Sequence, residues 1–289
     1  MTIPIGTLIP PQLAAQGMDE VAAWAKRIGL GVLDLPENFM PGVQACQAQG
    51  LRVGAVNGAG SADLISRDEH KREQAVARLQ EQIHTMSAAG ASILFLCLVP
   101  EERNQAITDS LAIYRETFPA IGAACEAAGV HVVFEGWPGP GPQYPTLGYT
   151  PETWRAMFAA VPSPALGLNY DPSHLARLGI DYLRVLEEFR DRIYHCHGKD
   201  TALMGEGQYL YGNLPPALGK APSFGGGAWR YCIPGDGVVD WSKIAFHLEQ
   251  AGYTGCVSIE LEDARYWGSV EQEQRGITKA YQHLARYFS

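Results

Sequence analysis

Two histidines, followed closely by a lysine and an aspartate, are the groups in this sequence most suited to chemistry. The stretch 194–200 reads Tyr-His-Cys-His-Gly-Lys-Asp. Alternate side chains of a β-strand share a face, so His195 and His197 would point the same way. Burying such groups costs free energy unless they have a polar partner, a metal or a catalytic role. A pair of hydrogen-bonded core histidines is the alternative, and the stretch alone does not separate the two interpretations.

Three other apolar segments also end in side chains that suit a divalent cation. Residues 130–135 end in Glu135, residues 165–171 end in Asp171 with His174 just beyond, and residues 255–260 end in Glu260 rather than in the more distant Glu262. With His197, they supply three carboxylates and one imidazole. This oxygen-dominated set favours Mn2+, with Mg2+, Co2+ or Zn2+ as alternatives. We therefore expect one divalent metal ion held by Glu135, Asp171, His197 and Glu260.

The elements that would position these groups alternate between short apolar segments and longer amphipathic ones, which is typical of repeated βα units. The predicted strands are residues 3–8, 31–35, 52–56, 92–98, 130–135, 165–171, 192–197 and 255–260. The predicted helices include residues 67–88, 104–128, 151–160, 181–189, 240–251 and 270–287. Another helix begins after an N-cap at Asp19 and ends at Gly29. Pro119 predicts a kink or a division in the helix over 104–128.

Eight such units without a polar linker predict one α/β domain over residues 1–289, a closed (β/α)8 TIM barrel. A doubly wound sheet is the alternative, but no Gly-x-Gly-x-x-Gly motif follows the first strand. The strands of a barrel end at one mouth, where the four ligands would converge. Two long segments, 136–149 and 201–239, follow the fifth and seventh strands. We expect both to be loops that form a pocket wall or lid, with an oligomer contact as the alternative for the longer one.

Composition narrows the functional classes. The chain has 289 residues, of which 46% are hydrophobic and 18% charged, so it can bury a sizeable core. Its net charge of -9 argues against a nucleic-acid partner. We see no segment typical of a membrane span or signal peptide, and six scattered cysteines predict reduced thiols in the cytoplasm. We expect a small carbohydrate substrate and no membrane partner, and leave a homo-oligomer open.

Five motifs, in this order, resemble the sugar phosphate isomerase/epimerase family of the xylose isomerase-like TIM barrel superfamily. They are Glu-Gly-Trp-Pro, Asn-Tyr-Asp-Pro-Ser-His, His-Gly-Lys-Asp, Pro-Gly-Asp-Gly-Val-Val-Asp-Trp and Ser-Ile-Glu-Leu-Glu-Asp. The resemblance spans nearly the whole chain. It implies that Glu135, Asp171, His197 and Glu260 bind one divalent metal. It also implies that His174 contacts substrate, and that Lys199 binds substrate or supports the ligands.

The chain departs from the ketose 3-epimerases of that family at two places. Those enzymes follow the glutamate of the fifth strand with Asn-Arg-aromatic-Glu and carry an arginine shortly after the metal-binding histidine. This sequence instead has Gly-Trp-Pro-Gly at 136–139 and Thr-Ala-Leu at 201–203. Another sugar isomerase or epimerase is therefore a better expectation. Arg230 is a candidate for the missing cation, with a surface role as the alternative. Trp137 is a candidate to pack on a sugar, with core packing as the alternative.

The expected reaction is proton transfer beside a carbonyl group through a metal-stabilised enediolate. Glu135 and Glu260 would be the acid/base pair, while His174 and Lys199 would stabilise charge developing on oxygen. This chemistry predicts a sugar isomerase or epimerase. A metal-dependent lyase acting on a keto sugar would use the same groups. An abasic-site endonuclease-like phosphodiesterase conflicts with the acidic charge, and a non-catalytic sugar-binding protein conflicts with the intact ligand and proton-carrying positions.

Overall fold

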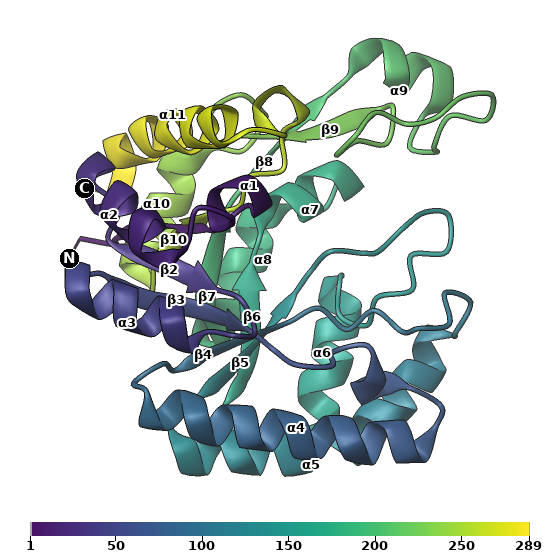
Figure 1. The fold of residues 1–289 in the computed structure, drawn as a ribbon. Helices are drawn as coiled ribbons and strands as arrows, with labels where there is room; N and C mark the ends of the chain where they lie inside the picture. Colours follow the sequence, from purple (N-terminus) through teal and green to yellow (C-terminus); the bar gives the residue numbers. More distant parts are fainter. Residues whose placement is uncertain (1, 289) are drawn as a thin grey trace. The chain divides into compact units, whose positions relative to one another are not determined.

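The computed structural model of the protein describes residues 2–288 and contains a closed barrel of eight parallel strands. The barrel strands are Ile5–Leu8 (β1), Val32–Leu35 (β2), Arg52–Asn57 (β3), Ile93–Leu96 (β4), His131–Glu135 (β5), Leu166–Tyr170 (β6), Ile193–Gly198 (β7) and Val257–Ile259 (β10). Their order around the barrel is β1-β10-β7-β6-β5-β4-β3-β2. Each predicted strand overlaps one of these, and the predicted fold class is confirmed (Figure 1).

Eleven α-helices occur within residues 2–288. They are Pro11–Ala14 (α1), Met18–Ile28 (α2), Met40–Gln49 (α3), Glu69–Ala88 (α4), Ile107–Ala128 (α5), Pro151–Ala160 (α6), Pro172–Leu178 (α7), Tyr182–Phe189 (α8), Gly205–Tyr211 (α9), Trp241–Gln250 (α10) and Val270–Phe288 (α11). Across the described part of the chain, no helix has both the length and the apolar character needed to cross a bilayer.

The chain divides into two compact units, and the first comprises residues up to 54, 171–191 and those from 195 onward. In this unit β1 pairs with β2 and β10, and β10 pairs with β7. The register places His197 beside Ser258, two residues before Glu260. Gly6 allows β1 and β2 to approach closely, because a Cβ at Gly6 would lie 2.8 Å from Val32 Cβ. One domain over residues 1–289 stays a prediction.

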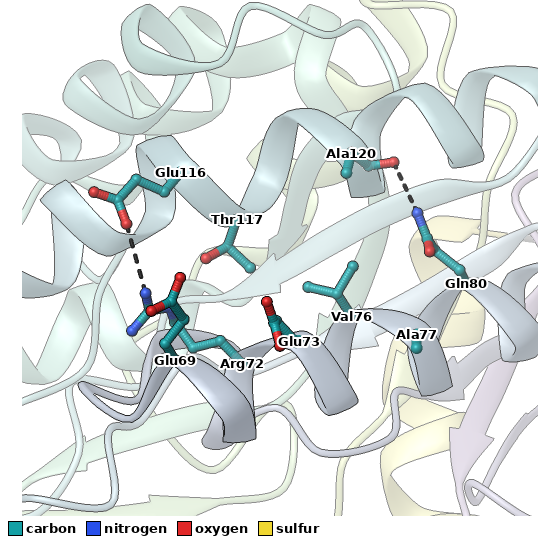
Figure 2. A pocket seen from close by; sticks show the side chains of 9 residues that line it. All are labelled: Glu69, Arg72, Glu73, Val76, Ala77, Gln80, Glu116, Thr117 and Ala120. Carbon is teal, nitrogen blue, oxygen red and sulfur yellow. Dashed lines mark hydrogen bonds and ion pairs between the residues drawn. The ribbon is translucent and has the colours of Figure 1, made fainter.

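The second unit comprises residues 55–170 and 192–194, with β4 to β6 and the end of β3. Its helices α4 and α5 lie side by side (Figure 1). Asp68 caps α4 by accepting hydrogen bonds from the backbone N–H groups of His70 and Lys71. A cleft of about 370 Å³ separates the exposed sides of α4 and α5, where Arg72 pairs with Glu116 at 3.6 Å (Figure 2).

One helix prediction is wrong, and of the kink or division predicted at Pro119 the division is excluded. Gly17, and not Asp19, is the N-cap of α2, so the carboxylate of Asp19 lies in the first turn, where it faces the positive end of the helix dipole. The division predicted at Pro119 is absent, because α5 runs unbroken from Ile107 to Ala128. Phe118 and Ile121 on either side of the proline are fully buried, and their packing offsets the backbone hydrogen bond that proline removes.

Segment 201–239 is not the loop that we expected. Strand β8, Asp200–Leu203, pairs antiparallel with β9, Trp229–Cys232. Helix α9 lies between the two strands in the sequence. The aromatic residues of β9 favour strand structure, which their glycine-rich surroundings concealed in the sequence. Asp200 anchors the segment. Its buried carboxylate accepts hydrogen bonds from the backbone N–H of Thr201, Gly235 and Val239 and from the indole of Trp241, at 2.8–3.3 Å.

The Asp200→Ala substitution should lower the free energy of unfolding by about 3 kcal/mol, because it leaves several buried donors without an acceptor. Urea denaturation followed by circular dichroism measures this change. Asp191→Ala is the matched control, since the Asp191 side chain is 92% exposed. A loss below about 1 kcal/mol in Asp200→Ala would show that other contacts hold segment 201–239 in place.

Candidate active site

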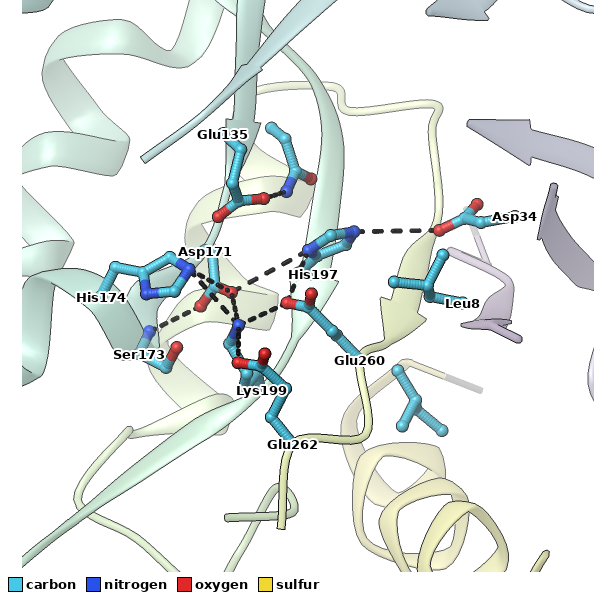
Figure 3. A network of polar contacts seen from close by, with 12 residues as sticks. Leu8, Asp34, Glu135, Asp171, Ser173, His174, His197, Lys199, Glu260 and Glu262 are labelled. Carbon is cyan, nitrogen blue, oxygen red and sulfur yellow. Dashed lines mark hydrogen bonds and ion pairs between the residues drawn. The ribbon is translucent and has the colours of Figure 1, made fainter. Parts of the chain in front are cut away.

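Asp171 lies where β6 gives way to α7, and its carboxylate has two roles. Oδ1 accepts a hydrogen bond from Ser173 N at 2.8 Å and thereby caps α7. Oδ2 is buried, accepts no hydrogen bond from residues 2–288, and lies 3.3 Å from Lys199 Nζ and 3.9 Å from His197 Nδ1 (Figure 3). The cap fixes the carboxylate so that its second oxygen can serve as a ligand.

His197 lies near the end of β7 and faces two carboxylates. Its Nδ1 is 3.1 Å from Glu260 Oε2, and its Nε2 is 3.9 Å from Asp34 Oδ2. One ligand-type atom from each of Asp171, His197 and Glu260 lies within 4.8 Å of the other two. Three of the four predicted ligands are therefore brought together in the first unit.

His195 and His197 share a face as predicted, with ring centroids 5.5 Å apart, but their surroundings differ. His195 Nε2 lies 3.0 Å from Asp34 Oδ2. Burial lowers the pKa of His195, but interactions with Asp34 and Cys256 together outweigh burial and raise that pKa to about 10. In turn, the two histidines lower the pKa of Asp34 although burial raises it. His195 is thus ion-paired with Asp34, whereas His197 also faces Glu260.

Lys199 is buried among three carboxylates of this cluster. Its Nζ donates hydrogen bonds to Glu260 and Glu262, the latter at 2.9 Å, and lies 3.3 Å from Asp171 Oδ2. Burial lowers the pKa of Lys199, but the carboxylates raise it well above its usual value, so the side chain is an ammonium ion. Three carboxylates against one ammonium leave two negative charges in excess. This excess and the hard donor atoms fit a divalent cation.

His174 joins the cluster from α7, because its Nε2 lies 3.5 Å from Asp171 Oδ2 and 3.3 Å from Lys199 Nζ. On the other side of the ring, Nδ1 lies 2.5 Å from the Tyr231 hydroxyl. Asp34, Arg177 and Tyr231 were missed as members of the site, and Glu262 was passed over in favour of Glu260. The spacing of Arg177, three residues after His174, was the one available signal, since it places both on one face of a helix.

The remaining predicted site residues are Glu135, Trp137 and Arg230. Glu135 ends β5 in the second unit, where its buried carboxylate accepts a hydrogen bond from Asn169. Trp137 lies in the same unit and is half-buried. Arg230 belongs to the first unit, but its Nη1 is 3.7 Å from Asp263 Oδ2 and donates to Tyr231 O. The functional roles of Glu135, Trp137 and Arg230 stay predictions.

A cavity of about 150 Å³ lies beside the carboxylates of Glu260 and Glu262. Its other walls are mostly apolar and comprise Leu8, Ile9, Pro10, Pro11, Leu261 and Trp267. A ligand here would meet charged oxygen atoms on one side and an aliphatic and aromatic surface on the other. Such a mixture of apolar wall and few polar groups is typical of small-molecule sites.

Residues 12–287 match the family described as xylose isomerase-like TIM barrel, and the chain belongs to this family. This match confirms the resemblance seen in the sequence motifs.

Two curated proteins are similar to parts of this chain. YfiH of Bacillus subtilis, an uncharacterized protein, is 37% identical over 119 residues, which are 40% of this chain and 37% of YfiH. Inosose dehydratase of Lacticaseibacillus casei is 27% identical over 142 residues, which are 49% of this chain and 44% of that enzyme. The chain thus spans less than half the length of these relatives.

Two solved structures share the fold over nearly the whole chain. Mannonate dehydratase from Streptococcus suis has a TM-score of 0.76 at 14% identity, covering 99% of this chain and 93% of that one. D-Allulose 3-epimerase from Methylomonas sp., in complex with D-allulose, has a TM-score of 0.72 at 15% identity, covering 99% and 98%. At these identities the likeness establishes the fold alone.

Replacing His197 or Glu260 with alanine should weaken binding of Mn2+ or Zn2+ by more than about 100-fold, because each change removes a ligand. Titration calorimetry measures the affinity, and thermal melting should show a folded protein. His70→Ala and Glu249→Ala, both at exposed positions, are the controls. Unchanged metal affinity, or unfolding of both variants, would identify His197 and Glu260 as structural residues.

The Asp34→Asn substitution should have a graded effect on the same affinity. Asn retains a hydrogen-bond acceptor but loses the charge beside His197 Nε2, so we expect a loss of about 10- to 100-fold. Asp19→Asn in the exposed first turn of α2 is the matched control. If metal affinity is unchanged while the melting temperature falls, Asp34 serves only the ion pair with His195.

Proposed function

We propose that this protein is a divalent-metal-dependent sugar isomerase or epimerase that moves a proton beside a carbonyl group. The observation that carries this proposal is the position of Lys199. Its buried ammonium contacts Glu260, which in turn lies 3.1 Å from His197. A fixed cation, a carboxylate and a ligand-type imidazole are therefore in contact, which is the combination that proton abstraction next to a carbonyl requires.

The metal ligands in this proposal are Glu135, Asp171, His197 and Glu260. The proximity of the last three and the excess negative charge around Lys199 support the assignment. Glu135 is included because it ends a strand of the same parallel barrel and is buried. A bound divalent ion would supply Lewis acidity toward the carbonyl and hydroxyl oxygens of a sugar. Its identity, with Mn2+ favoured, is part of the proposal.

The reaction itself divides among the side chains of this chain. Glu260 and Glu135 form the acid/base pair, one taking a proton from carbon and the other returning it. The ammonium of Lys199 stabilises negative charge on the substrate oxygen, because its neighbouring carboxylates keep it protonated. His174 contacts the same oxygen atom of the substrate. Burial of Asp171, His174, His197 and Lys199 keeps this chemistry in a water-poor setting, which strengthens each electrostatic contact.

The substrate in this proposal is a small carbohydrate. The cavity beside Glu260 and Glu262 offers carboxylates for hydroxyl groups and an apolar wall, with Trp267, for a carbon–hydrogen face of a sugar ring. Trp137 and Arg230 are retained as proposed substrate contacts on the basis of the sequence. D-Allulose in the epimerase of Methylomonas sp. is an example of a ligand of this class.

A lyase acting on a keto sugar is the second candidate, and the similarity to inosose dehydratase favours it specifically. Both reactions begin by removing a proton beside a carbonyl. They diverge afterwards, because an isomerase returns a proton whereas a dehydratase releases the neighbouring hydroxyl group as water.

Elemental analysis combined with deuterium uptake from heavy water tests the proposal. We expect about one divalent ion per chain and deuterium at a carbon beside the carbonyl in at least one ketose, aldose or keto sugar. Deuterium in a product that is an isomer of the substrate supports the isomerase. Loss of water from a keto sugar supports the lyase. Absence of both metal and exchange, with sugar binding still detectable by calorimetry, would identify a non-catalytic sugar-binding protein.

The Lys199→Met substitution separates charge stabilisation from metal binding. It should lower kcat by about 100- to 1000-fold, because it removes a donor aimed at the developing oxyanion. Metal affinity should not fall, since removing the ammonium leaves more negative charge in the cluster. Lys243→Met, at an exposed residue paired with Asp240, is the control. Loss of metal in Lys199→Met without loss of fold would show that Lys199 acts by positioning the ligands.

A further inference from the structure

Trp267 is the aromatic wall of the cavity beside the carboxylates. This cavity has a volume of about 150 Å³, and Glu260 and Glu262 are the charged side chains that line it within residues 2–288. Apart from the indole, its remaining walls are aliphatic. Trp267 is half-buried and directly follows the 3-10 helix Ala264–Tyr266 (η3). The ligand that fits this cavity is therefore selected by two carboxylates, an indole and aliphatic groups.

Phe224 packs its ring against the Trp267 indole from a distant part of the chain. The two ring centroids lie 4.9 Å apart and the ring planes are inclined by 72°, which is an edge-to-face contact. Phe224 lies just before β9, in the segment 201–239 that we expected to form a pocket wall or lid. The contact stabilises one orientation of the indole.

The backbone of Phe224 adopts a conformation that a bulky side chain rarely takes. Its φ of 55° is in the left-handed region, where a Cβ atom is crowded and glycine is preferred. The Phe224 carbonyl accepts a hydrogen bond from Tyr231 N at 2.7 Å, and Gly226 N donates to Trp229 O at 2.9 Å. These hydrogen bonds to β9 hold the strained conformation in place. Backbone strain of this kind is typical of sites where a side chain must occupy one position.

A buried carboxylate ties the two segments that carry the rings. Asp263 is 1% exposed and accepts a hydrogen bond through Oδ2 from Ile233 N, just beyond β9, at 3.3 Å. Its Oδ1 accepts from Arg265 N in η3 at 3.0 Å and so caps the helix that precedes Trp267. The edge-to-face contact between Phe224 and Trp267 is therefore fixed from both segments.

The charges around the cavity disfavour an anionic ligand. No lysine or arginine is among the residues that line it within the described part of the chain. The nearby ammonium of Lys199 is already paired with the three carboxylates of the cluster. A divalent ion would balance the two excess negative charges there and leave no positive charge for a phosphate. A phosphate ester would thus lack a cationic partner, whereas a neutral hydroxyl group can donate hydrogen bonds to Glu260 and Glu262.

We propose that the Trp267 indole, held in place by Phe224, is the wall that selects an unphosphorylated sugar. The indole packs on carbon-bound hydrogen atoms of the sugar, and the two carboxylates accept hydrogen bonds from its hydroxyl groups. Phe224 is a positioning residue, because its ring contacts the indole and does not line the cavity. The substrate class rests on the proposed function, whereas binding can be measured without turnover.

Calorimetry with matched pairs of sugars tests the selection. The full chain, saturated with Mn2+, is titrated with D-allulose, D-fructose and D-glucose and with the 6-phosphate of each. We expect at least one free sugar to bind about 10-fold or more tightly than its phosphate ester, because the phosphate adds charge that no cation pairs. Equal or tighter binding of the esters, or no binding of any free sugar, would overturn the proposal.

Two substitutions test the indole itself. Trp267→Leu keeps an apolar side chain but removes the ring, and it should weaken binding of the free sugar by about 10-fold. Trp267→Phe keeps an aromatic face and should bind more tightly than Trp267→Leu. Phe246→Leu is the control, since Phe246 is 58% exposed on α10. Unchanged affinity in Trp267→Leu would show that the sugar does not pack on this ring.

Three Phe224 variants separate the ring from the backbone. Phe224→Gly and Phe224→Ala remove the ring and should weaken sugar binding by about 3- to 10-fold, whereas Phe224→Tyr should bind as wild type does. Glycine adopts a φ of 55° without strain, so Phe224→Gly should melt at a higher temperature than Phe224→Ala. Wild-type affinity in Phe224→Gly would refute the positioning role of Phe224.

Deuterium exchange distinguishes failure of this proposal from failure of the proposed function. Sugar binding that depends on Trp267, with no exchange in any sugar, would support the wall and refute the isomerase. Exchange in wild type, with the affinity unchanged in Trp267→Leu, would refute the wall and leave the isomerase standing. In Phe224→Gly, KM should rise while kcat stays within about 3-fold of wild type, because the ring contacts no reacting atom.

Discussion

A buried ammonium ion is the constraint on which the site depends. Lys199 is 1% exposed, and an unpaired charge at such a depth would cost several kcal/mol. Asp171, Glu260 and Glu262 offset that cost, but only if their strand ends keep all three oxygens within reach of one nitrogen. The register of β7 against β10 meets this requirement, because it sets His197 beside Ser258 and thus brings Glu260 close to Lys199. The strand register of the fold is therefore what allows the carboxylates to balance the charge of Lys199.

The side chains that face the cluster are each fixed by a second contact. Asp171 caps α7 with one oxygen and offers the other to the cluster. His197 has Glu260 on one side and Asp34 on the other. His174 has Tyr231 behind it. A site preorganised in this way loses little rotamer freedom when it binds a cation or substrate, so more of the interaction free energy remains for binding.

Features that depend on local hydrophobic periodicity could be predicted from the sequence. Side chains that enter the site through contacts between distant residues could not. Short apolar segments revealed all eight strands, and residue type at strand ends revealed Asp171, His197 and Glu260, because parallel strands of a barrel end at one mouth. Asp34 could not be recognised, since its partner His195 is 161 residues away. Tyr231 was hidden for the same reason, 57 residues from His174 in a segment whose glycines indicated a loop.

The electrostatics of the cluster bear on the proton-transfer step that an isomerase and a lyase share. The carboxylates that raise the pKa of Lys199 also make its proton hard to give away, so Lys199 suits charge stabilisation better than general-acid catalysis. A lyase needs an acid for the departing hydroxyl group. Glu262, 30% exposed, accepts a hydrogen bond from the Lys199 ammonium at 2.9 Å. An isomerase instead needs a group that returns a proton to carbon, the role proposed for one member of the Glu260 and Glu135 pair. The contacts around Lys199 therefore suit the stabilisation of negative charge on an oxygen atom, which both reactions need when the proton beside the carbonyl is removed.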